Sequence, residues 1–535
     1  MTAILFLISF LTRLIFLYHG FPSITHDEAD YFINSYLLAK SGTDILGNRL
    51  FLTSGILNAT SAIPVYIGSI IFLFLGKSII VSRLPFALFN SFTPVVFYLI
   101  LKKLTNNKTF SAIGFIVFNF SPWFSYLSAQ SAFDSPISLL FYLLAFYVLL
   151  TNIKPIKKYL LFLALSFLSF NSYMGIKTSF PFLIFTALLT ESIYFKKKIY
   201  FRQIAKKIAV SLMVFAVFFM MVEIAPGSWQ FQSRLKEKLL PLNSKILSGR
   251  VLTERSITNQ QSVVKNLIAN KLTAFSSLFF EQYIDAFNPY FVFVKGDQHV
   301  IYGTNYIGLF YLFDLFFLVA GFYFADEVLK SKKSTVVPFF LIFVFAAIPL
   351  GLTIDTPNIS IRGYPLIIAY VFFISVGVFQ IGRIIFKTER KTLLAIVAIY
   401  LVSFIFFFTL FQVIIKNASA DQWHIMEKVL SAKLHNLAAK DPNQKIIVYV
   451  NEPKETLLLY LFYEENDAGV IRKSLSNDNY SVGNLEFSSH CPQAKIKNTF
   501  QILHSQRCPV NTKVFTPEVL VPPVNNLSPA YFLLK

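Results

Sequence analysis

Long apolar runs are the feature that most constrains this chain. Eleven stretches of about 14 to 24 residues carry almost no charge. A bilayer's hydrocarbon core is about 30 Å thick, and a helix rising about 1.5 Å per residue crosses it in about 20 residues. We therefore predict an all-α polytopic membrane protein with about 11 transmembrane helices. The runs cover residues 3–19, 82–101, 109–122, 135–151, 159–174, 178–195, 208–225, 305–325, 335–353, 364–385 and 392–415.

The composition excludes several other classes of protein. Of the 535 residues, 55% are hydrophobic and only 14% are charged, whereas soluble domains are about 25% charged. A soluble enzyme, a disordered chain and a coiled coil are excluded, and 2 cysteines exclude a disulfide scaffold. A net charge of +20 would indicate nucleic-acid binding in a soluble protein. Here basic residues set the orientation in the membrane, so the predicted partner is the lipid bilayer and not nucleic acid.

A twelfth apolar run, Ile63–Leu75, decides the predicted orientation. Its 13 residues span only about 20 Å as a helix, too little to cross upright. If this run lies in the interface, five Lys/Arg-rich loops all face the cytoplasm, and the alternating short loops carry only Lys177 and Arg362. We predict this arrangement, which obeys the positive-inside rule, with a cytoplasmic N-terminus and an external C-terminus in the plasma (cytoplasmic) membrane. The basic loops are 102–108, 154–158, 196–207, 330–333 and 383–391.

This orientation leaves three substantial pieces outside the membrane. They are residues 20–80, residues 226–304 with charges of both signs, and the tail 417–535. We predict a transmembrane domain over 1–416 and a small extracytoplasmic α/β domain over 417–535, which is long enough to fold alone.

The pattern of the tail supports an α/β fold. Trp423–Ala439 and Glu455–Glu464 have helical periodicity, and Lys445–Val450 is an apolar run typical of a buried strand. Both cysteines, Cys491 and Cys508, fall in the tail. A disulfide is permitted outside the cytoplasm, so a bridge and two free thiols both stay open.

An acidic cluster follows the first apolar run. The segment reads His26-Asp27-Glu28-Ala29-Asp30-Tyr31, and residues 29–40 have the pattern of an amphipathic helix lying along the interface. Carboxylates packed together repel one another, and a carboxylate with a raised pKa can accept a proton from an attacking hydroxyl. The alternative is an ordinary helix N-terminus, where acidic residues favour the helix dipole.

Further polar residues map to the predicted outer ends of the apolar runs. Alone, each has a structural interpretation, such as a helix cap for Asp134 or a snorkelling side chain for Lys177. Together they suit a base opposite a phosphate-binding group, and the apolar walls indicate that the phosphate belongs to a lipid. The residues are Ser121-Pro122-Trp123 followed by Gln130 and Asp134, then Lys177, Asp297, His299 with Tyr302, and Arg362.

Several of these segments, in this order, resemble one known family. The sequence His26–Asp30 after a first transmembrane helix resembles the acidic motif of the GT-C membrane glycosyltransferases, of the protein O-mannosyltransferase and aminoarabinose-transferase type (family 39-like, RgtA/B/C/D-like). The resemblance covers roughly residues 1–416. Its other parts are Ser82–Leu88, similar to an "RLPxAL" motif, Ser121–Trp123, Gly296–His299 followed by Tyr311–Asp314, and Asp355–Asn358 with Arg362.

The resemblance implies sugar transfer, with inversion, from a polyprenyl-phosphate donor to an extracytoplasmic acceptor that is a protein, a lipid or a cell-envelope glycan. It implies Asp27 as the general base and Glu28 as a residue that tunes the base or orients the acceptor. Three residues are implied to bind the donor phosphate: Lys177, His299 and Arg362. The rest of the pocket would comprise His26, Asp30, Gln130, Asp134 and Tyr302.

No DxD motif lies near Asp134, so we predict chemistry without an essential metal or other cofactor. Two other functions stay open. A flippase or transporter of lipid-linked substrates would place ionisable residues near the bilayer midplane, whereas those of this chain map to the outer ends. An inactive relative acting as a binding module is the third interpretation, because Gln130, Asp134 and Ala62-Ile63-Pro64 differ from the residues usual in the family.

Overall fold

The computed structural model describes most of the chain. The described residues are 1–57, 60–128, 134–195, 200–257, 262–328, 335–354, 360–476, 480–492, 496, 498–508, 517–523 and 530–534. Contacts divide the chain into two compact units. The first contains Met1–Arg13, Leu88–Ser128 and Phe133–Phe407. The second is built mainly from Leu14–Ala87 and Phe408–Lys535, so the tail shares a unit with the first predicted external piece.

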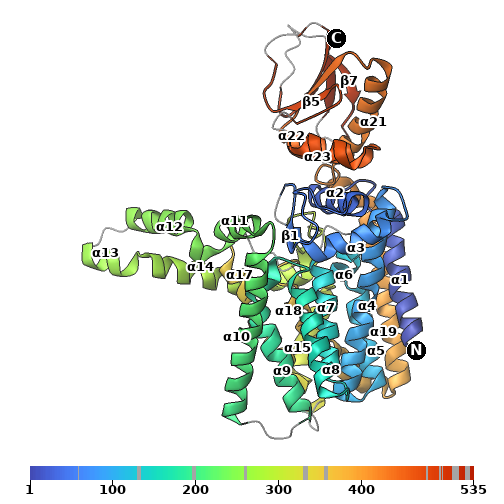
Figure 1. Ribbon diagram of the computed structural model, residues 1–535. Coiled ribbons are helices and arrows are strands. Elements are labelled where there is room, and N and C mark those ends of the chain that lie inside the picture. Colours follow the sequence, from blue (N-terminus) through green and yellow to red (C-terminus); the bar gives the residue numbers. More distant parts are fainter. Residues whose placement is uncertain are drawn as a thin grey trace. The chain divides into compact units, whose positions relative to one another are not determined.

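The first unit is mainly helical, and each of the eleven apolar runs contains at least one helix, although α1, α4 and α19 extend into the second unit (Figure 1). Five helices of the described residues are long and apolar enough to cross a membrane, and six shorter apolar helices accompany them. The number of crossings and their direction stay predictions. The helices of these runs are α1 (Thr2–His19), α4 (Ile79–Thr105), α5 (Lys108–Phe120), α7 (Asp134–Leu149), α8 (Pro155–Phe170), α9 (Phe180–Phe195), α10 (Phe201–Ile224), α15 (Leu312–Val328), α16 (Val336–Phe345), α17 (Ile348–Leu352), α18 (Tyr364–Phe386) and α19 (Glu389–Leu410).

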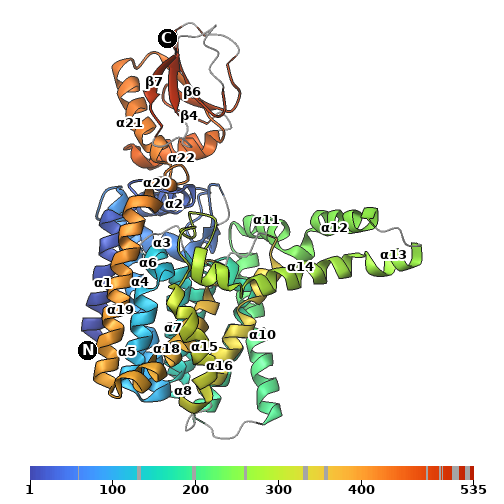
Figure 2. The same cartoon turned by 180° about the vertical axis from the view of Figure 1, so that it is seen from behind.

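Helix α18 lies in the middle of the first unit and contacts α5, α7, α15 and α16 (Figure 2). Its packing against α15 depends on two glycines. A Cβ atom on Gly377 would overlap the carbonyl of Phe317, and one on Gly321 would overlap the carbonyl of Phe373. Small residues let membrane helices approach closely enough for backbone contact, so these glycines set the distance between α15 and α18.

The arginine inside the first apolar run is enclosed by polar partners. Arg13 is 1% exposed; its Nε donates to the Ser128 hydroxyl at 2.8 Å and its Nη1 donates to Asn119 Oδ1 at 2.8 Å. The guanidinium also lies 4.4 Å from the centre of the Phe124 ring. These contacts explain how α1 accommodates a cation, because charges within membrane helices need partners on neighbouring helices.

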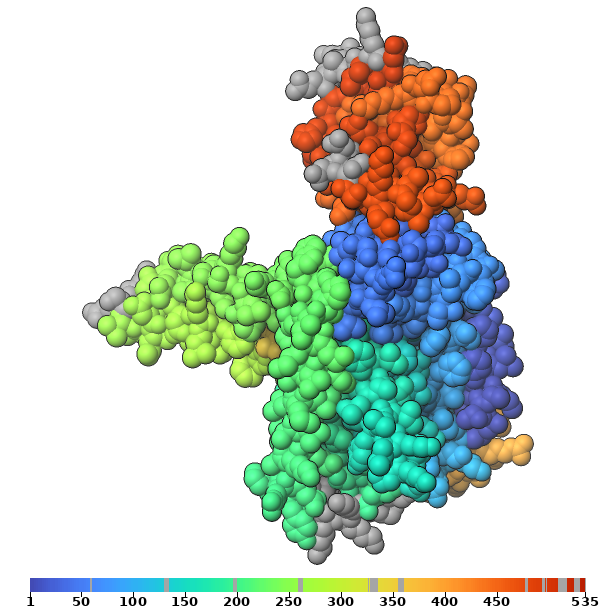
Figure 3. All heavy atoms as spheres, viewed as in Figure 1, coloured from blue at the N-terminus to red at the C-terminus, as the bar shows by residue number. Residues whose placement is uncertain are grey.

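The predicted external piece 226–304 is largely helical. It contains α11 (Ser228–Lys238), α12 (Ser244–Ile257), α13 (Ser262–Ile268) and α14 (Lys271–Asp285), followed by a π-helical turn, Tyr290–Lys295. Helices α12 to α14 form an arm that projects from the other helices of the first unit (Figures 1 and 3). Its base is held where α14 packs against α17 and the Tyr283 hydroxyl donates to the Val344 carbonyl at 2.9 Å.

The second unit contains two helices that the sequence predicted at the interface. Helix α2 (His26–Ser41) covers the amphipathic segment, and α3 (Ala62–Phe72) covers most of the short apolar run. With 11 residues, α3 is only about 16 Å long. It lies against α2, where the Ser35 hydroxyl donates to the Val65 carbonyl at 3.1 Å and Gly68 leaves room for Ser35. Its location at the membrane surface stays a prediction.

The tail has the predicted α/β character. Among its described residues, six strands form one sheet in the order β4-β5-β3-β6-β8-β7, with β3 parallel to both neighbours and the remaining pairs antiparallel. The predicted strand is β3 (Lys445–Tyr449), and four of its five side chains are buried. The other elements are α20 (Lys416–Ala418), α21 (Ile425–Lys440), α22 (Pro453–Tyr463), α23 (Ala468–Ser476), β4 (Ser481–Val482), β5 (Leu485–Ser488), β6 (Thr499–His504), β7 (Pro517–Val521) and β8 (Tyr531–Leu534).

The two cysteines settle the question that the sequence left open. Cys491 and Cys508 form a disulfide, with their Cα atoms 5.6 Å apart. Cys508 is 2% exposed and packs in a core cluster with Ile447, Tyr449 and Leu503. The bridge therefore joins the loop after β5 to the apolar centre of the sheet.

Lysine and arginine side chains of the tail join it to the segment 14–87 within the second unit. Lys454 Nζ donates to the Ile56 carbonyl at 2.6 Å, and Arg472 Nη2 donates to the Thr43 hydroxyl at 2.6 Å. In the opposite direction, Lys77 Nζ donates to the Leu461 carbonyl at 2.8 Å. These hydrogen bonds fix α22 and α23 beside the region that contains the acidic motif.

Candidate active site

The acidic motif forms the N-terminus of α2. Thr25 caps the helix: its hydroxyl accepts from the Glu28 N–H at 3.1 Å, and its own N–H donates to Glu28 Oε2 at 3.2 Å. This capping box shows that the acids do occupy a helix N-terminus. Asp27, the second residue of the helix, keeps 24% of its side chain exposed, and His26 Nε2 lies 3.5 Å from its Oδ1. The carboxylate of Asp27 is therefore partly accessible to solvent.

Glu28 is buried against Arg83, a residue of the "RLPxAL" motif. Arg83 Nε lies 2.7 Å from Glu28 Oε1 and Arg83 Nη2 lies 2.5 Å from Glu28 Oε2, which makes the ion pair bidentate. Arg83 also donates to the carbonyls of Phe21 and Ser23. Arg83 was not among the predicted site residues, although a cation at the start of an apolar run indicates that a partner lies nearby.

Asp30 holds a loop in place. Its carboxylate accepts from the backbone N–H groups of Ile56 and Leu57, each at 2.8 Å, and from the Asn34 side chain at 2.9 Å. With Glu28 at 0% and Asp30 at 1% exposure, Asp27 carries the accessible carboxylate of the motif.

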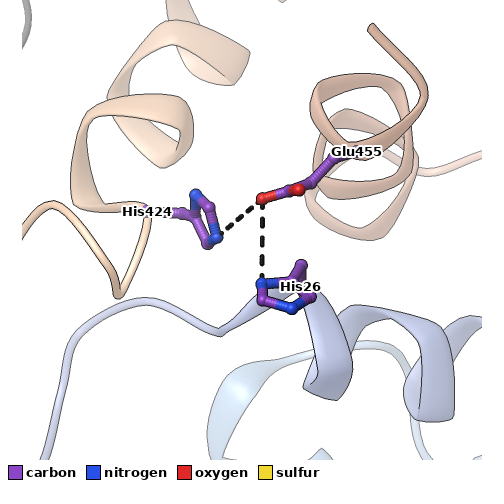
Figure 4. A group of neighbouring side chains, drawn as sticks. All are labelled: His26, His424 and Glu455. Atoms are coloured by element: carbon purple, nitrogen blue, oxygen red, sulfur yellow. Dashed lines mark ion pairs between the residues drawn. The ribbon is translucent and has the colours of Figure 1, made fainter. Parts of the chain in front are cut away.

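Two residues of the tail lie beside His26 (Figure 4). His424 precedes α21, and its Nε2 is 3.0 Å from Oε1 of Glu455 in α22; His26 Nδ1 is 3.8 Å from the same oxygen. Burial alone would lower the pKa of His424, but Glu427 and Glu455 together raise it to about 10 from its ordinary 6.5. Sequence reasoning missed this cluster because about 400 residues separate His26 from His424 along the chain.

The first unit contains the predicted phosphate-binding residues. Lys177 lies in a short 3₁₀ turn, Gly175–Thr178, between α8 and α9. Its side chain is 3% exposed, and its Nζ donates to the Phe170 carbonyl at 3.1 Å and lies 4.8 Å from the centre of the Phe170 ring. Burial lowers the pKa of Lys177 to about 7, while the charge of Asp134, the first residue of α7, opposes this shift.

Arg362 lies in the same neighbourhood. Its side chain forms a hydrogen bond with Tyr173, which precedes Lys177 by four residues and interacts electrostatically with Asp134. The Tyr173 ring packs at 5.9 Å from that of Tyr364, at the start of α18. Lys177, Asp134 and Arg362 are thus grouped through Tyr173.

The loop that carries His299 reaches this group through Asp297. The His299 N–H donates to Asp297 Oδ1 at 2.9 Å, and the His299 ring stacks on Tyr302 at 4.6 Å. Burial raises the pKa of Asp297 to about 6, and the hydrogen bond from the His299 N–H, the nearby Ser360 and the Arg362 charge limit the rise. The indole of Trp123, from the Ser-Pro-Trp motif, donates to the Ser360 carbonyl at 2.8 Å.

The predicted site residues therefore form two groups, one in each unit. His26, Asp27, Glu28 and Asp30 lie in the second unit, and Asp134, Lys177, His299, Tyr302 and Arg362 lie in the first. Gln130 and the segment 355–358 lie outside the described residues.

Comparison with known proteins establishes the fold. No family model matches the chain, and no curated protein matches it. ArnT from Cupriavidus metallidurans bound to undecaprenyl phosphate aligns over 99% of this chain and 97% of its own, with 11% identity and a TM-score of 0.53. Apo ArnT from the same organism aligns with a TM-score of 0.40. The apo oligosaccharyltransferase of Archaeoglobus fulgidus aligns over 86% of this chain and 64% of its own, with a TM-score of 0.45. The first similarity confirms the predicted GT-C fold. At 11% identity it supports the fold and not a particular activity.

Proposed function

We propose that this chain is an integral membrane glycosyltransferase that moves a sugar from a polyprenyl-phosphate donor to an extracytoplasmic acceptor. The observation that carries the proposal is the fold shared over nearly the whole chain with a protein bound to undecaprenyl phosphate. The apolar helices and the polar residues at their ends support it. We place the enzyme in the plasma membrane, with the N-terminus in the cytoplasm and the chemistry outside, following the distribution of Lys and Arg.

Asp27 is the proposed general base. Its carboxylate is partly exposed, while the neighbouring Glu28 and Asp30 carboxylates are buried in contacts with Arg83 and with backbone amides. Glu28 is then a positioning residue, because its capping bonds and its ion pair with Arg83 fix the first turn of α2 on which Asp27 sits.

Lys177 and Arg362 are the proposed ligands of the donor phosphate, with His299 beside them. An ammonium supplies a point charge and a guanidinium binds two phosphate oxygens at once. Asp134 keeps the buried Lys177 nearer its charged form, since its charge raises the pKa of that lysine. Tyr302, stacked on His299, would orient the imidazole.

The proposed reaction is a single displacement. The acceptor hydroxyl oxygen attacks the anomeric carbon while Asp27 accepts the hydroxyl proton, and the bond from that carbon to the phosphate oxygen breaks. Polyprenyl phosphate leaves with the bonding electron pair, and Lys177 and Arg362 stabilise its negative charge. Attack opposite to the leaving group inverts the configuration at the anomeric carbon.

Reconstituted vesicles test the class of function. The purified protein is mixed with radiolabelled polyprenyl-phosphate sugar and a crude cell-envelope fraction as the source of acceptor. We expect label to reach the acceptor with wild-type protein and with Asp467→Asn, a matched change of an exposed carboxylate in the same unit, but not with Asp27→Asn.

Two results would contradict the proposal. Movement of the labelled lipid between leaflets without cleavage of its sugar would identify a flippase. Binding of the lipid without transfer by any variant, the wild type included, would identify an inactive relative.

A further inference from the structure

Three side chains from distant segments of the second unit converge on one point. His26 begins α2, His424 precedes α21 and Glu455 lies in α22, and one ligand atom from each lies within 4.8 Å of the others. Figure 4 shows both imidazoles directed at the same carboxylate oxygen. The distances to Glu455 Oε1 are 3.8 Å from His26 Nδ1 and 3.0 Å from His424 Nε2.

We infer that His26, His424 and Glu455 form a binding site for a divalent transition-metal ion, with Zn²⁺ as the ion that fits best. In a tetrahedral zinc site with bonds of about 2.0–2.2 Å, ligand atoms lie about 3.4 Å apart, a value between the two distances above. Two imidazoles and one carboxylate suit zinc, whereas Mg²⁺ and Ca²⁺ select oxygen ligands. Three protein ligands leave a fourth position for water.

A carboxylate lies near the second ring nitrogen of each histidine. Histidines that bind a metal through one nitrogen usually direct the other at a carboxylate or carbonyl, which fixes the ring orientation. Here His26 Nε2 faces Asp27 Oδ1 at 3.5 Å, and His424 Nδ1 faces Glu427 Oε2 at 3.6 Å. Glu427 is itself held by the Tyr531 hydroxyl, which donates to its Oε1 at 2.9 Å.

The same unit contains an ordinary histidine–glutamate pair for comparison. His435 Nδ1 lies 2.6 Å from Glu464 Oε2, again between α21 and α22, but the His435 side chain is 60% exposed. Neither residue belongs to a group of three potential ligands among the described residues. This pair therefore supplies a control that separates metal binding from simple ion pairing.

A bound ion would join α2 to α21 and α22. It would thereby hold the tail against the first turn of α2, where Asp27 contacts the His26 ring. The ion would have this structural role and takes no part in the glycosyl-transfer step proposed above. The inference therefore stands whether or not the proposed enzymatic activity is found.

The test uses full-length protein in detergent, with any affinity tag removed and metal stripped by dipicolinate. After dialysis against Zn²⁺, mass spectrometry of the metal content is expected to find one zinc per chain in the wild type and in His435→Ala. His424→Ala and Glu455→Gln are expected to lose it, and Glu427→Gln to weaken binding about 10- to 100-fold. Zinc should raise the unfolding temperature of the wild type and of His435→Ala but not of His424→Ala.

A second readout needs no substitution. X-ray absorption of the zinc-loaded wild type is expected to show two imidazole ligands and oxygen in the first coordination sphere. A coordination sphere without imidazole, no bound zinc, or equal zinc content in the wild type and in His424→Ala and Glu455→Gln would overturn the inference.

Discussion

Arg83 and Glu28 form a bidentate ion pair that is sealed from solvent. Both side chains are 2% exposed or less. The two residues are 55 apart in sequence, and their ion pair joins α2 to the start of α4. Arg83 also lies 5.4 Å from the centre of the Trp423 ring, which stacks on Phe21. The residue next to the proposed base therefore belongs to a buried ion pair, in which each charge needs the other to remain stable inside the protein.

Breaking this pair on one side should be costly. Arg83→Met removes the cation that balances the buried Glu28 carboxylate, and we expect a loss of about 3–5 kcal/mol in the free energy of unfolding. The double variant Arg83→Met/Glu28→Leu should recover most of this loss, because an apolar pair of similar size avoids the buried charge. Denaturant unfolding in detergent measures both, and a double variant no better than the single one would contradict this account.

Donor binding should weaken as pH rises above about 7. The pKa of Lys177 is lowered to about 7 by burial, so its ammonium loses its proton there, whereas the donor phosphodiester keeps its charge. Lys177→Arg, always charged, should bind the donor with little pH dependence, and Lys177→Met should bind weakly throughout. Affinity measured in nanodiscs between pH about 6 and about 9 checks this, and a wild type without pH dependence would refute it.

The same lysine gives stability the opposite pH dependence. Between its folded pKa of about 7 and its ordinary 10.5, the unfolded chain binds a proton that the folded chain lacks. Burying the charged lysine destabilises the folded chain. This penalty is full below pH 7, shrinks as pH rises from 7 to 10.5 and is absent above pH 10.5. In the donor-free protein, Lys177→Met should remove this rise of unfolding free energy with pH.

The bridge between Cys491 and Cys508 should stabilise the second unit. It closes a loop with a sequence separation of 17, for which chain-entropy models give about 3 kcal/mol. Cys491→Ser/Cys508→Ser is expected to lower the unfolding temperature, and a reducing agent should lower that of the wild type but not of the double variant. Equal sensitivity of both proteins to reduction would exclude the bridge as the cause.

Because α15 packs closely on α18, replacing a glycine by alanine should destabilise the protein in α18 but not in the exposed helix α12. Gly377→Ala places a methyl group against the Phe317 carbonyl and should cost about 1–3 kcal/mol. Gly249→Ala in α12 meets nothing within 4 Å and should be neutral or stabilising by up to about 1 kcal/mol. Thermal unfolding of the two variants side by side decides, and equal effects would contradict the packing described.

The sequence predicted the helices well because hydrocarbon thickness sets the length of an apolar run. The predicted strand at Lys445–Val450 and the helix pattern of the tail were also found. From the sequence, Lys177, Asp134 and Arg362 were each predicted at the same end of the helices. In the structure the three residues lie near one another around Tyr173. Their roles stay predictions.

Contacts between distant segments were beyond the sequence. The role of Asp30 in the pocket stays a prediction. Its carboxylate accepts hydrogen bonds from the backbone N–H groups of Ile56 and Leu57, a contact that only the folded loop shows. His424 and Glu455 are single polar residues in a polar tail, so no local pattern distinguished them. Arg83 was noted as part of a motif, yet its partner is fixed by helix packing and not by spacing.

The rate of sugar transfer by Asp27→Asn tests the central claim most directly. Purified wild type and variant are compared with one defined polyprenyl-phosphate sugar, and donor affinity is measured separately. A lost general base should lower kcat about 10²- to 10⁴-fold while leaving donor affinity unchanged. Transfer by Asp27→Asn at the wild-type rate would show that Asp27 is not the base.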